Sequence, residues 1–179
     1  MKIVTLNDKK FAVSLPETEI KARVKELAEQ ISRDMDGKNP LFIPILNGAF
    51  MFAADLIREM TIPSEITFVK LSSYQGTSST GKVQEMIGVG EDLTGRNVVI
   101  VEDIVETGLT VCKMVEQAKA LNAASVKVCS LFFKPELLKD GQAPDYVAFS
   151  IPNDFIVGYG LDYNQKGRWL RDIYTLVSD

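Results

Sequence analysis

Two adjacent carboxylates and a short hydroxyl-bearing loop stand in the middle of the chain. The apolar run 98–101 predicts a buried strand that ends at Glu102 and Asp103, and residues 111–115 have helical spacing. Backbone amides in a tight loop and in the first turn of a helix favour a phosphate anion. Carboxylates at the carboxyl end of a strand lie where open α/β sheets bind ligands. The stretch indicates a site for a phosphorylated sugar; a solvated strand end followed by an ordinary capped helix is the alternative.

The loop residues fit a phosphate, and the two acids can have separate tasks. Gly108 permits a tight backbone, while Thr107 and Thr110 add hydroxyl donors. Because consecutive strand side chains point in opposite directions, Glu102 and Asp103 need not share one role.

The composition limits the chemistry available to such a site. The chain has 179 residues, a formal net charge of −4 and no histidine. Ser-His and Cys-His nucleophilic schemes and His-ligated zinc are therefore excluded, and acid–base work falls to carboxylates, lysine, tyrosine, cysteine or the substrate itself. The acidic balance offers no basic surface for nucleic acid. A small anionic substrate would need local positive residues or metal ions.

The cysteines and the apolar stretches indicate the cellular compartment in which the protein works. Cys112 and Cys129 lie in separate apolar stretches, which is typical of buried free thiols in a reducing compartment. Residues 1–8 contain no signal-peptide core, and the most apolar stretch, 41–57, is interrupted too soon for a membrane span. We expect a cytoplasmic protein.

Apolar spacing predicts the elements that position the central loop. We expect helices beginning near residues 16, 49 and 111, and strands over residues 41–46, 66–71, 83–89, 98–101, 125–133, 146–149 and 156–158. This alternation indicates one α/β domain spanning residues 1–179, with an open, mainly parallel sheet flanked by helices. Residues 2–15 and the unclassified tail 165–179 must form something added to that sheet.

A polar run at residues 72–82 contains a second candidate motif. Residues 76–82 match the G-x-x-x-x-G-K of a P-loop, but Val83 stands where that motif needs Ser or Thr for magnesium. The residues that follow alternate like a strand and not like a helix. We expect a lid or a connection here, and a P-loop nucleotidase is a distant alternative.

Four segments carry a more specific combination: residues 46–48 (Leu-Asn-Gly), 72–74 (Ser-Ser-Tyr), 102–110 and 155–162. Together they resemble the purine phosphoribosyltransferase family, in its hypoxanthine-guanine branch. The resemblance implies the phosphoribosyltransferase type I fold, with a small hood formed by the chain ends. It also implies purine salvage, in which Mg²⁺ assists transfer of a 5-phosphoribosyl group from phosphoribosyl pyrophosphate to hypoxanthine or guanine, giving IMP or GMP and pyrophosphate.

The resemblance assigns the sugar and its phosphates to the first half of the site. Glu102 and Asp103 would bind the ribose hydroxyls, directly or through magnesium. Asn47 and Gly48 would hold the pyrophosphate by backbone donors. Ser73 and Tyr74 would lie in a loop that closes over the reaction and excludes water. The 5-phosphate would lie in the loop formed by Glu106, Thr107, Gly108, Leu109 and Thr110.

The resemblance assigns the purine to the second half of the site. By resemblance, Lys134 would meet the oxo group of the purine, Phe155 would stack on its ring, and the backbone of Ile156 would read its edge. Asp162 would lie near a second magnesium, and Arg168 would contact the pyrophosphate. From the residues alone, Phe155 could instead belong to the core, Lys134 could be a solvated strand end and Asp162 a turn acid.

Two positions depart from the family's pattern. Glu106 stands where the family usually has Asp, and Asn47 where it often has Lys. Glu106 is our candidate for the base that removes the purine proton. Its extra methylene can displace the carboxylate by more than about an ångström, and misplacement on that scale can cost about a hundredfold in rate. Asn47 matters less if it acts through its backbone.

The sequence thus predicts a magnesium-dependent phosphoribosyltransferase with small-molecule substrates and without nucleic-acid or membrane partners. The family is commonly dimeric or tetrameric, which implies a homo-oligomer. The alternative is a regulator that keeps this fold and binds RNA or a partner protein, although the acidic balance speaks against RNA.

Overall fold

A seven-stranded sheet forms the centre of the protein. The structure is a computed structural model that describes residues 2–73, 83–87, 90–139 and 141–177. The strand order is β6-β5-β3-β7-β8-β9, with β4 also paired to β3, and only the pairing of β5 with β6 is antiparallel. The predicted open, mainly parallel sheet is confirmed. Its strands are β3 (Leu41–Leu46), β4 (Glu65–Ile66), β5 (Val69–Ser73), β6 (Val83–Ile87), β7 (Asn97–Val105), β8 (Ser125–Phe133) and β9 (Tyr146–Ser150).

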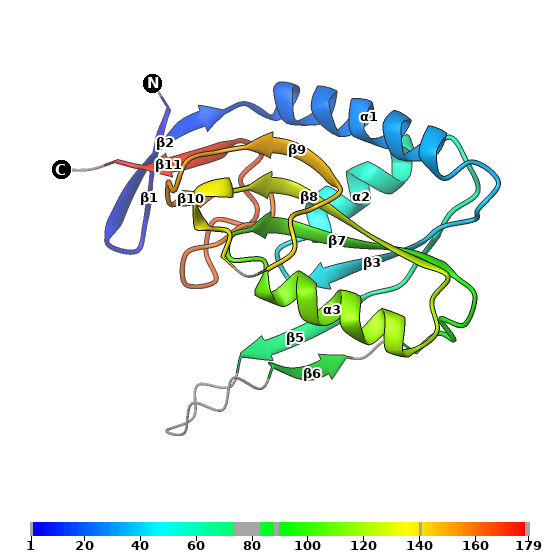
Figure 1. Cartoon of the computed structure of the whole chain (residues 1–179). Helices are drawn as coiled ribbons and strands as arrows, with labels where there is room; N and C mark the ends of the chain where they lie inside the picture. Colours follow the sequence, from blue (N-terminus) through cyan, green and yellow to red (C-terminus); the bar gives the residue numbers. More distant parts are fainter. Residues whose placement is uncertain (1, 74–82, 88–89, 140, 178–179) are drawn as a thin grey trace.

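Helices cover both faces of this sheet, with α1 and α2 on one face and α3 on the other (Figure 1). In α1 the apolar residues recur at helical spacing, so Ile20, Leu27 and Ile31 are completely buried. Burial of one such side chain stabilises the folded state by roughly 2 kcal/mol. Within the described residues, no helix is long and apolar enough to cross a membrane. The helices are α1 (Glu17–Asp34), α2 (Phe50–Glu59), α3 (Leu109–Ala120) and the short 3₁₀ helix η1 (Pro135–Leu137).

The central strand β7 continues past the two acids, so the prediction that they end it is wrong. Its backbone pairs with β8 as far as Val105 opposite Phe133, and Glu102 lies opposite Ser130. The reason is a long-range one: β8 is equally long and stays in register with β7 beyond the apolar run. Glu102 and Asp103 are therefore held by a ladder on the way to the loop.

The side chains of β7 break their alternation at these two acids. Val99 and Val101 pack beneath α1 and α2, as the two-residue period of a strand requires. Ile104 packs on the same side, although it lies three positions after Val101 and regular alternation would point it to the other side. Glu102 and Asp103 occupy the break, and their carboxyl groups interact with each other.

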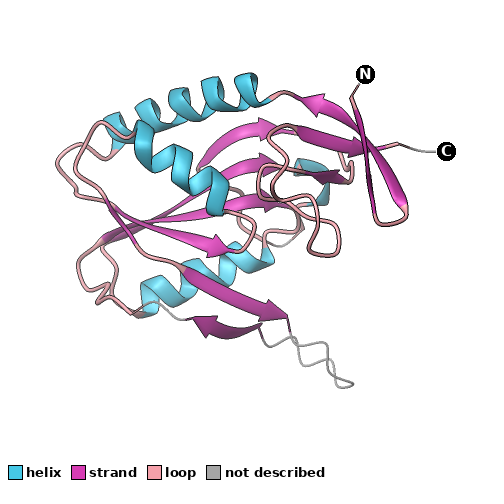
Figure 2. Ribbon diagram, turned by 180° about the vertical axis from the view of Figure 1, so that it is seen from behind, coloured by secondary structure: helices cyan, strands magenta, loops and turns pink. Residues whose placement is uncertain are grey.

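The two chain ends form a second, four-stranded antiparallel sheet, which confirms the predicted hood. This hood lies beyond the carboxyl ends of the parallel strands (Figures 1 and 2). The tail that sequence patterns did not classify supplies one of its central strands. The strands of the hood, in spatial order, are β1 (Ile3–Leu6), β2 (Lys9–Leu15), β11 (Ile173–Leu176) and β10 (Ile156–Val157).

The segment between α2 and β7 differs from the prediction in one respect. The strand expected over residues 66–71 is divided into β4 and β5, and both parts pair in parallel with β3. The strand expected after the polar run is confirmed as β6. The P-loop match at residues 76–82 and Tyr74 lie outside the described residues.

Candidate active site

The loop after β7 forms a small pocket at the start of α3. Gly108 precedes the helix in the left-handed conformation, with a φ of 77°, which glycine adopts without strain. The hydroxyl of Thr107 accepts a hydrogen bond from the Leu109 amide at 3.4 Å. The pocket holds about 120 Å³, and its lining includes Glu102, Glu106 and Thr110. The first amides of α3 carry partial positive charge, so an anionic group is favoured here.

A second loop packs against the loop that carries Thr107 and Gly108. A β-carbon on Gly108 would lie 2.8 Å from Leu138 Cδ1, and one on Gly141 would lie 2.3 Å from the Thr107 carbonyl oxygen. The two backbones therefore touch, and larger residues would separate them. No local signal in the sequence indicates that Gly141 packs against the loop at Thr107 and Gly108.

Glu102 is buried and Asp103 is half-buried, and the backbone holds both carboxyl groups. Backbone amides donate to both: the Asp103 amide to Glu102 Oε1 at 3.3 Å and the Ile104 amide to Asp103 Oδ1 at 2.9 Å. Burial raises the pKa of Glu102 well above its usual value, and the neighbouring Asp103 raises it further. Burial also raises the pKa of Asp103, against the lowering effect of its hydrogen bonds and of Arg168. A cation beside the pair would relieve this cost of ionisation.

These two carboxylates fit a divalent cation that is shared with a substrate. Mg²⁺ commonly uses one or two carboxylates and completes its shell with water and phosphate oxygens. Among the described residues, no group of three or more acidic, cysteine or histidine side chains is placed to hold a metal. Glu102 and Asp103 would therefore share Mg²⁺ with other oxygen atoms, such as those of water and phosphate.

Gly48 packs between Asp103 of the acid pair and the loop that carries Gly160. A β-carbon on Gly48 would lie 1.7 Å from Asp103 Oδ2, and one on Gly160 would lie 2.2 Å from the Gly48 carbonyl oxygen. The neighbouring Leu46–Asn47 peptide bond is cis, and Asn47 is exposed. Three segments far apart in the sequence thus meet here without room for side chains.

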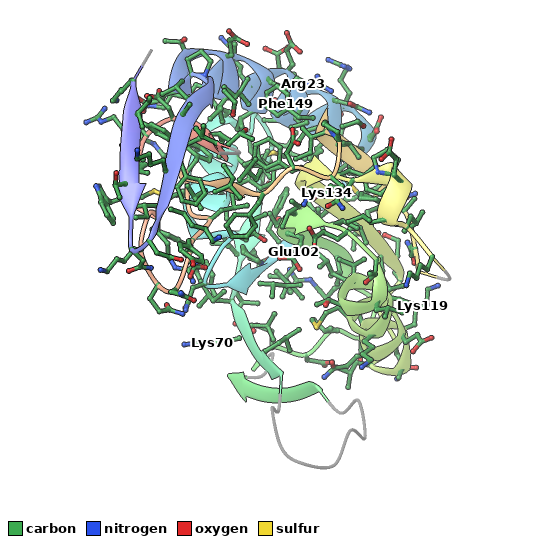
Figure 3. The ribbon with its side chains drawn as sticks, turned by 90° about the vertical axis from the view of Figure 1, so that its left-hand side faces the viewer. Arg23, Lys70, Glu102, Lys119, Lys134 and Phe149 are labelled. Carbon is green, nitrogen blue, oxygen red and sulfur yellow. The ribbon has the colours of Figure 1, made fainter. Side chains whose placement is uncertain are left out.

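A second pocket, of about 210 Å³, adjoins the first. Glu106 and Ile104 line both pockets, which places them at the junction. Figure 3 views this end of the protein, with Glu102 and Lys134 toward the middle of the face. The second pocket is lined by Asp103, Ile104, Glu106, Lys134, Phe155, Ile156, Leu161 and Asp162.

Lys134 is a buried cation in this second pocket. Only 4% of the residue is exposed, so its interpretation as a solvated strand end is wrong. Its Nζ donates to Glu106 Oε1 at 2.6 Å and to Asn153 Oδ1 at 3.4 Å. Burial of an ammonium group is tolerated when such acceptors surround it. Asn153 was not anticipated, because an exposed loop residue gives no pattern in the sequence.

Phe155 and Ile156 face this pocket from the hood. Phe155 is 44% exposed and is therefore not a core residue, whereas Ile156 is buried in β10. The Phe155 ring lies 6.0 Å from the Phe11 ring and meets the Tyr163 ring edge-on at 5.7 Å. An exposed ring with aromatic neighbours can stack on a flat ligand.

Asp162 pairs with Arg168 and lines the second pocket together with Asp103. Arg168 Nη2 is 2.7 Å from Asp162 Oδ1, and Arg168 Nη1 donates to the Gly160 carbonyl oxygen at 2.8 Å. The backbone amide of Gln165 donates to Asp162 Oδ2 at 2.7 Å. Arg168 still reaches the acid pair electrostatically through Asp103. Ser73 ends β5, where its backbone pairs with Val83.

The chain is similar to phosphoribosyltransferases over most of its length. The family described as "Phosphoribosyl transferase domain" matches residues 15–164. Hypoxanthine-guanine phosphoribosyltransferase of Mycobacterium tuberculosis is 41% identical over 172 residues, which cover 92% of this chain and 85% of that protein.

Two solved structures extend this similarity to the fold. A hypoxanthine-guanine phosphoribosyltransferase of Bacillus anthracis, with a HEPES molecule in the active site, is 38% identical with a TM-score of 0.88, covering 98% of this chain and all of that one. A hypoxanthine phosphoribosyl transferase of Trypanosoma cruzi, studied for the role of its C-terminal region in oligomeric state and activity, is 35% identical with a TM-score of 0.88, covering 97% and 95%.

Proposed function

The chain belongs to the phosphoribosyltransferase family, in its hypoxanthine-guanine branch, and we propose that it transfers the 5-phosphoribosyl group from phosphoribosyl pyrophosphate to hypoxanthine or guanine. The products are IMP or GMP and pyrophosphate, in a reaction of purine salvage. One observation carries this proposal: two pockets meet at Glu106, one built around Gly108 and the other lined by Lys134 and Phe155. A phosphorylated sugar and a flat base can approach each other at that junction.

The sugar phosphate is assigned to the pocket at the start of α3. Backbone amides around Gly108 and the hydroxyls of Thr107 and Thr110 supply donors for the 5-phosphate. The pyrophosphate is assigned to the backbone of Asn47 and Gly48 and to Arg168. The contact between Gly160 and Gly48 supports this grouping, because it brings the loop that carries Arg168 onto the turn at Gly48.

We assign Mg²⁺ to Glu102 and Asp103, with Asp162 as a ligand near a second ion. When bound, Mg²⁺ neutralises charge on the leaving pyrophosphate. The two carboxylates have a second role. Departure of pyrophosphate leaves positive charge on the ribose ring, and nearby negative groups stabilise that charge. Ser73 and Tyr74 belong to the loop that we expect to exclude water from this cation.

Lys134 gives the second pocket a preference for oxopurines. An ammonium group can only donate hydrogen bonds, so it suits the 6-oxo group of hypoxanthine or guanine and opposes the 6-amino group of adenine. Because Lys134 is buried, a substrate that leaves it unsatisfied loses more than a solvent-facing contact would cost. Phe155 stacks on the purine, and the backbone of Ile156 reads its edge.

Glu106 is our candidate for the base that takes the purine proton. It is the carboxylate at the junction of the two pockets, and its Oε1 is held by Lys134 at 2.6 Å. The side chain of Glu106, which is one methylene longer than the Asp that the family usually has here, is therefore anchored. Such anchoring offsets the loss of positional precision that an extra methylene brings.

The remaining expectations concern assembly and location. Glu106 and Lys134 come from the large sheet while Phe155 comes from the hood, which supports residues 1–179 working as one domain. We propose a homodimer or homotetramer, as is common in the family. We also propose a cytoplasmic enzyme, in keeping with the free thiols of Cys112 and Cys129.

A panel of purines tests the proposed function. The purified protein is incubated with phosphoribosyl pyrophosphate, Mg²⁺ and either hypoxanthine, guanine, xanthine or adenine, and pyrophosphate release is measured beside nucleotide formation. We expect equimolar pyrophosphate and nucleotide with hypoxanthine or guanine, and none with adenine. Protein that released no pyrophosphate with any oxopurine would overturn the proposal, and RNA binding at physiological salt would then favour the regulator.

A further inference from the structure

The hairpin of β1 and β2 contacts Phe155, which lines the base pocket around Lys134, although most of the hairpin precedes the residues that match the family. The match begins at residue 15, whereas the turn of the hairpin lies at Asn7 and Asp8. Asp8 Oδ1 accepts a hydrogen bond from the Tyr163 hydroxyl at 2.7 Å, and Asn7 Nδ2 donates to the Tyr163 carbonyl oxygen at 3.3 Å. Two side chains of one turn therefore hold one tyrosine.

Tyr163 in turn supports the ring of Phe155. The two rings meet edge-on, at an interplanar angle of 86° and a centroid distance of 5.7 Å. Phe11, from β2, is completely buried and lies 6.0 Å from Phe155 and 6.1 Å from Tyr163. Lys9 adds a cation 6.0 Å from the centre of the Tyr163 ring. Phe155 thus has aromatic neighbours from the hairpin and from the 163 loop, while 44% of it stays exposed.

A stacking ring needs support of this kind because its last torsion is soft. The χ2 angle of phenylalanine has a broad energy well, so an unsupported exposed ring samples many orientations. Fixing that ring when a ligand binds costs conformational entropy, whereas a ring fixed in advance avoids the cost. Edge-to-face aromatic pairs also contribute beyond the area that they bury.

We propose that Asp8 and Tyr163 are positioning residues for the purine: their hydrogen bond fixes the Tyr163 ring, which fixes Phe155 for stacking. The inference rests on the proposed function, since it assumes that Phe155 meets a base. It predicts that the hairpin acts on base binding and leaves the phosphate half of the site unchanged. Neither residue is expected to touch the substrate or the reacting atoms.

The test compares three substitutions. Tyr163→Phe removes the hydroxyl and keeps the ring, Asp8→Ala removes the acceptor, and Asp8→Asn keeps an oxygen that can accept. We expect the first two to raise the KM for hypoxanthine about fivefold, the size of one lost hydrogen bond, with kcat and the KM for phosphoribosyl pyrophosphate within about twofold of the wild type. Asp8→Asn should have the wild-type KM for hypoxanthine. The double variant that combines Asp8→Ala with Tyr163→Phe should raise this KM no more than either single substitution does.

A second hydrogen bond in the hood supplies the matched control. Thr175 Oγ1 donates to Ser14 Oγ at 2.8 Å between β11 and β2, and neither side chain lines the base pocket. Thr175→Val removes that bond and should leave the hypoxanthine KM unchanged. An unchanged KM in Tyr163→Phe, or an equal rise in Thr175→Val, would overturn the positioning role alone. A wild-type protein without transferase activity would overturn the proposed function and this inference with it.

Discussion

The two pockets that meet at Glu106 are built in different ways. The phosphate pocket, the one that we assign to the 5-phosphate, is lined by residues that all fall between Glu102 and Val111, around the end of β7 and the start of α3. The base pocket draws its lining from residues 103 to 162 and takes further support from Asp8, Phe11 and Arg168. One half of the site is therefore made by local backbone geometry and the other by side chains that the fold brings together.

This difference predicts where each half is vulnerable. Backbone donors survive most substitutions, so the phosphate half and the turn at Gly48 should fail mainly where a side chain has no room. The base half should fail where a single functional group is removed. Substitutions can therefore separate the two halves by which substrate they affect.

We expect the largest effect from Gly48→Ala, which tests the packing behind the pyrophosphate. The added β-carbon would lie 1.7 Å from Asp103 Oδ2, so the backbone or the acid must move. Displacement of the metal-type carboxylate on that scale should lower kcat/KM by about a hundredfold or more. Gly90→Ala is the control, because a β-carbon there meets nothing within 4 Å. Steady-state kinetics beside thermal melting check this, and an active Gly48→Ala would disprove the packing constraint.

Lys134→Met should have the next largest effect, confined to the base half. The substitution removes a buried charged donor, so kcat/KM for hypoxanthine should fall about 10- to 100-fold. Binding of phosphoribosyl pyrophosphate, measured by calorimetry, should change by less than about twofold. Lys127→Met is a matched control on the same strand, where Lys127 pairs with Asp145 at 2.8 Å away from both pockets. An equal loss of kcat/KM for hypoxanthine and of affinity for phosphoribosyl pyrophosphate would contradict the separation of the two halves.

Thr107→Val should have a small effect on the phosphate half. The hydroxyl is lost, but the amides of the loop and of α3 remain, so the dissociation constant of phosphoribosyl pyrophosphate should rise about two- to fivefold. The KM for hypoxanthine should not change. Calorimetry with the sugar donor alone gives the first value. A loss as large as that of Lys134→Met would mean that side chains, and not the backbone, dominate this pocket.

The smallest expected effect is a pH dependence of stability that contrasts the acid pair with the hood. The folded-state pKa of Glu102 is raised, so above its ordinary value of 4.5 the unfolding free energy of the metal-free protein falls as pH rises. The Glu17 backbone amide and Lys2 lower the pKa of Asp172, so the stability that Asp172 contributes is lost as pH falls below its ordinary value of 3.8. Mg²⁺ should therefore raise the melting temperature more at pH 8 than at pH 5, by ~2 °C or more. Equal shifts at both pH values would argue against metal binding at the acid pair.

The same contrast explains what the sequence could predict. The tight loop that leads into α3 is predictable from its own residues because Thr107, Gly108 and the helix start lie within a few positions of each other. The alternation of strands and helices also gave the large sheet, since apolar periodicity reports burial locally. The end of β7 was misjudged because its length depends on pairing with β8 and not on its own pattern.

Contacts between distant segments could not be predicted in this way. The Glu106–Lys134 pair, the acceptor Asn153 and the packing at Gly141 each join positions that only the fold brings together. The family resemblance indicates Lys134 and Phe155 as candidates, but it does not indicate which neighbouring residues position their side chains. The hydrogen bond between Asp8 and Tyr163 spans 155 positions and leaves no local signal.

The most direct measurement of the central claim, that chemistry takes place at Glu106 where the two pockets join, is the kinetics of Glu106→Gln. This substitution keeps the size of the side chain and an oxygen that can accept from Lys134, but it removes the basic carboxylate. We predict a fall in kcat of about a hundredfold or more, with the dissociation constant of phosphoribosyl pyrophosphate within about threefold of the wild type. Equal losses in turnover and in binding would contradict the claim and make Glu106 a binding residue.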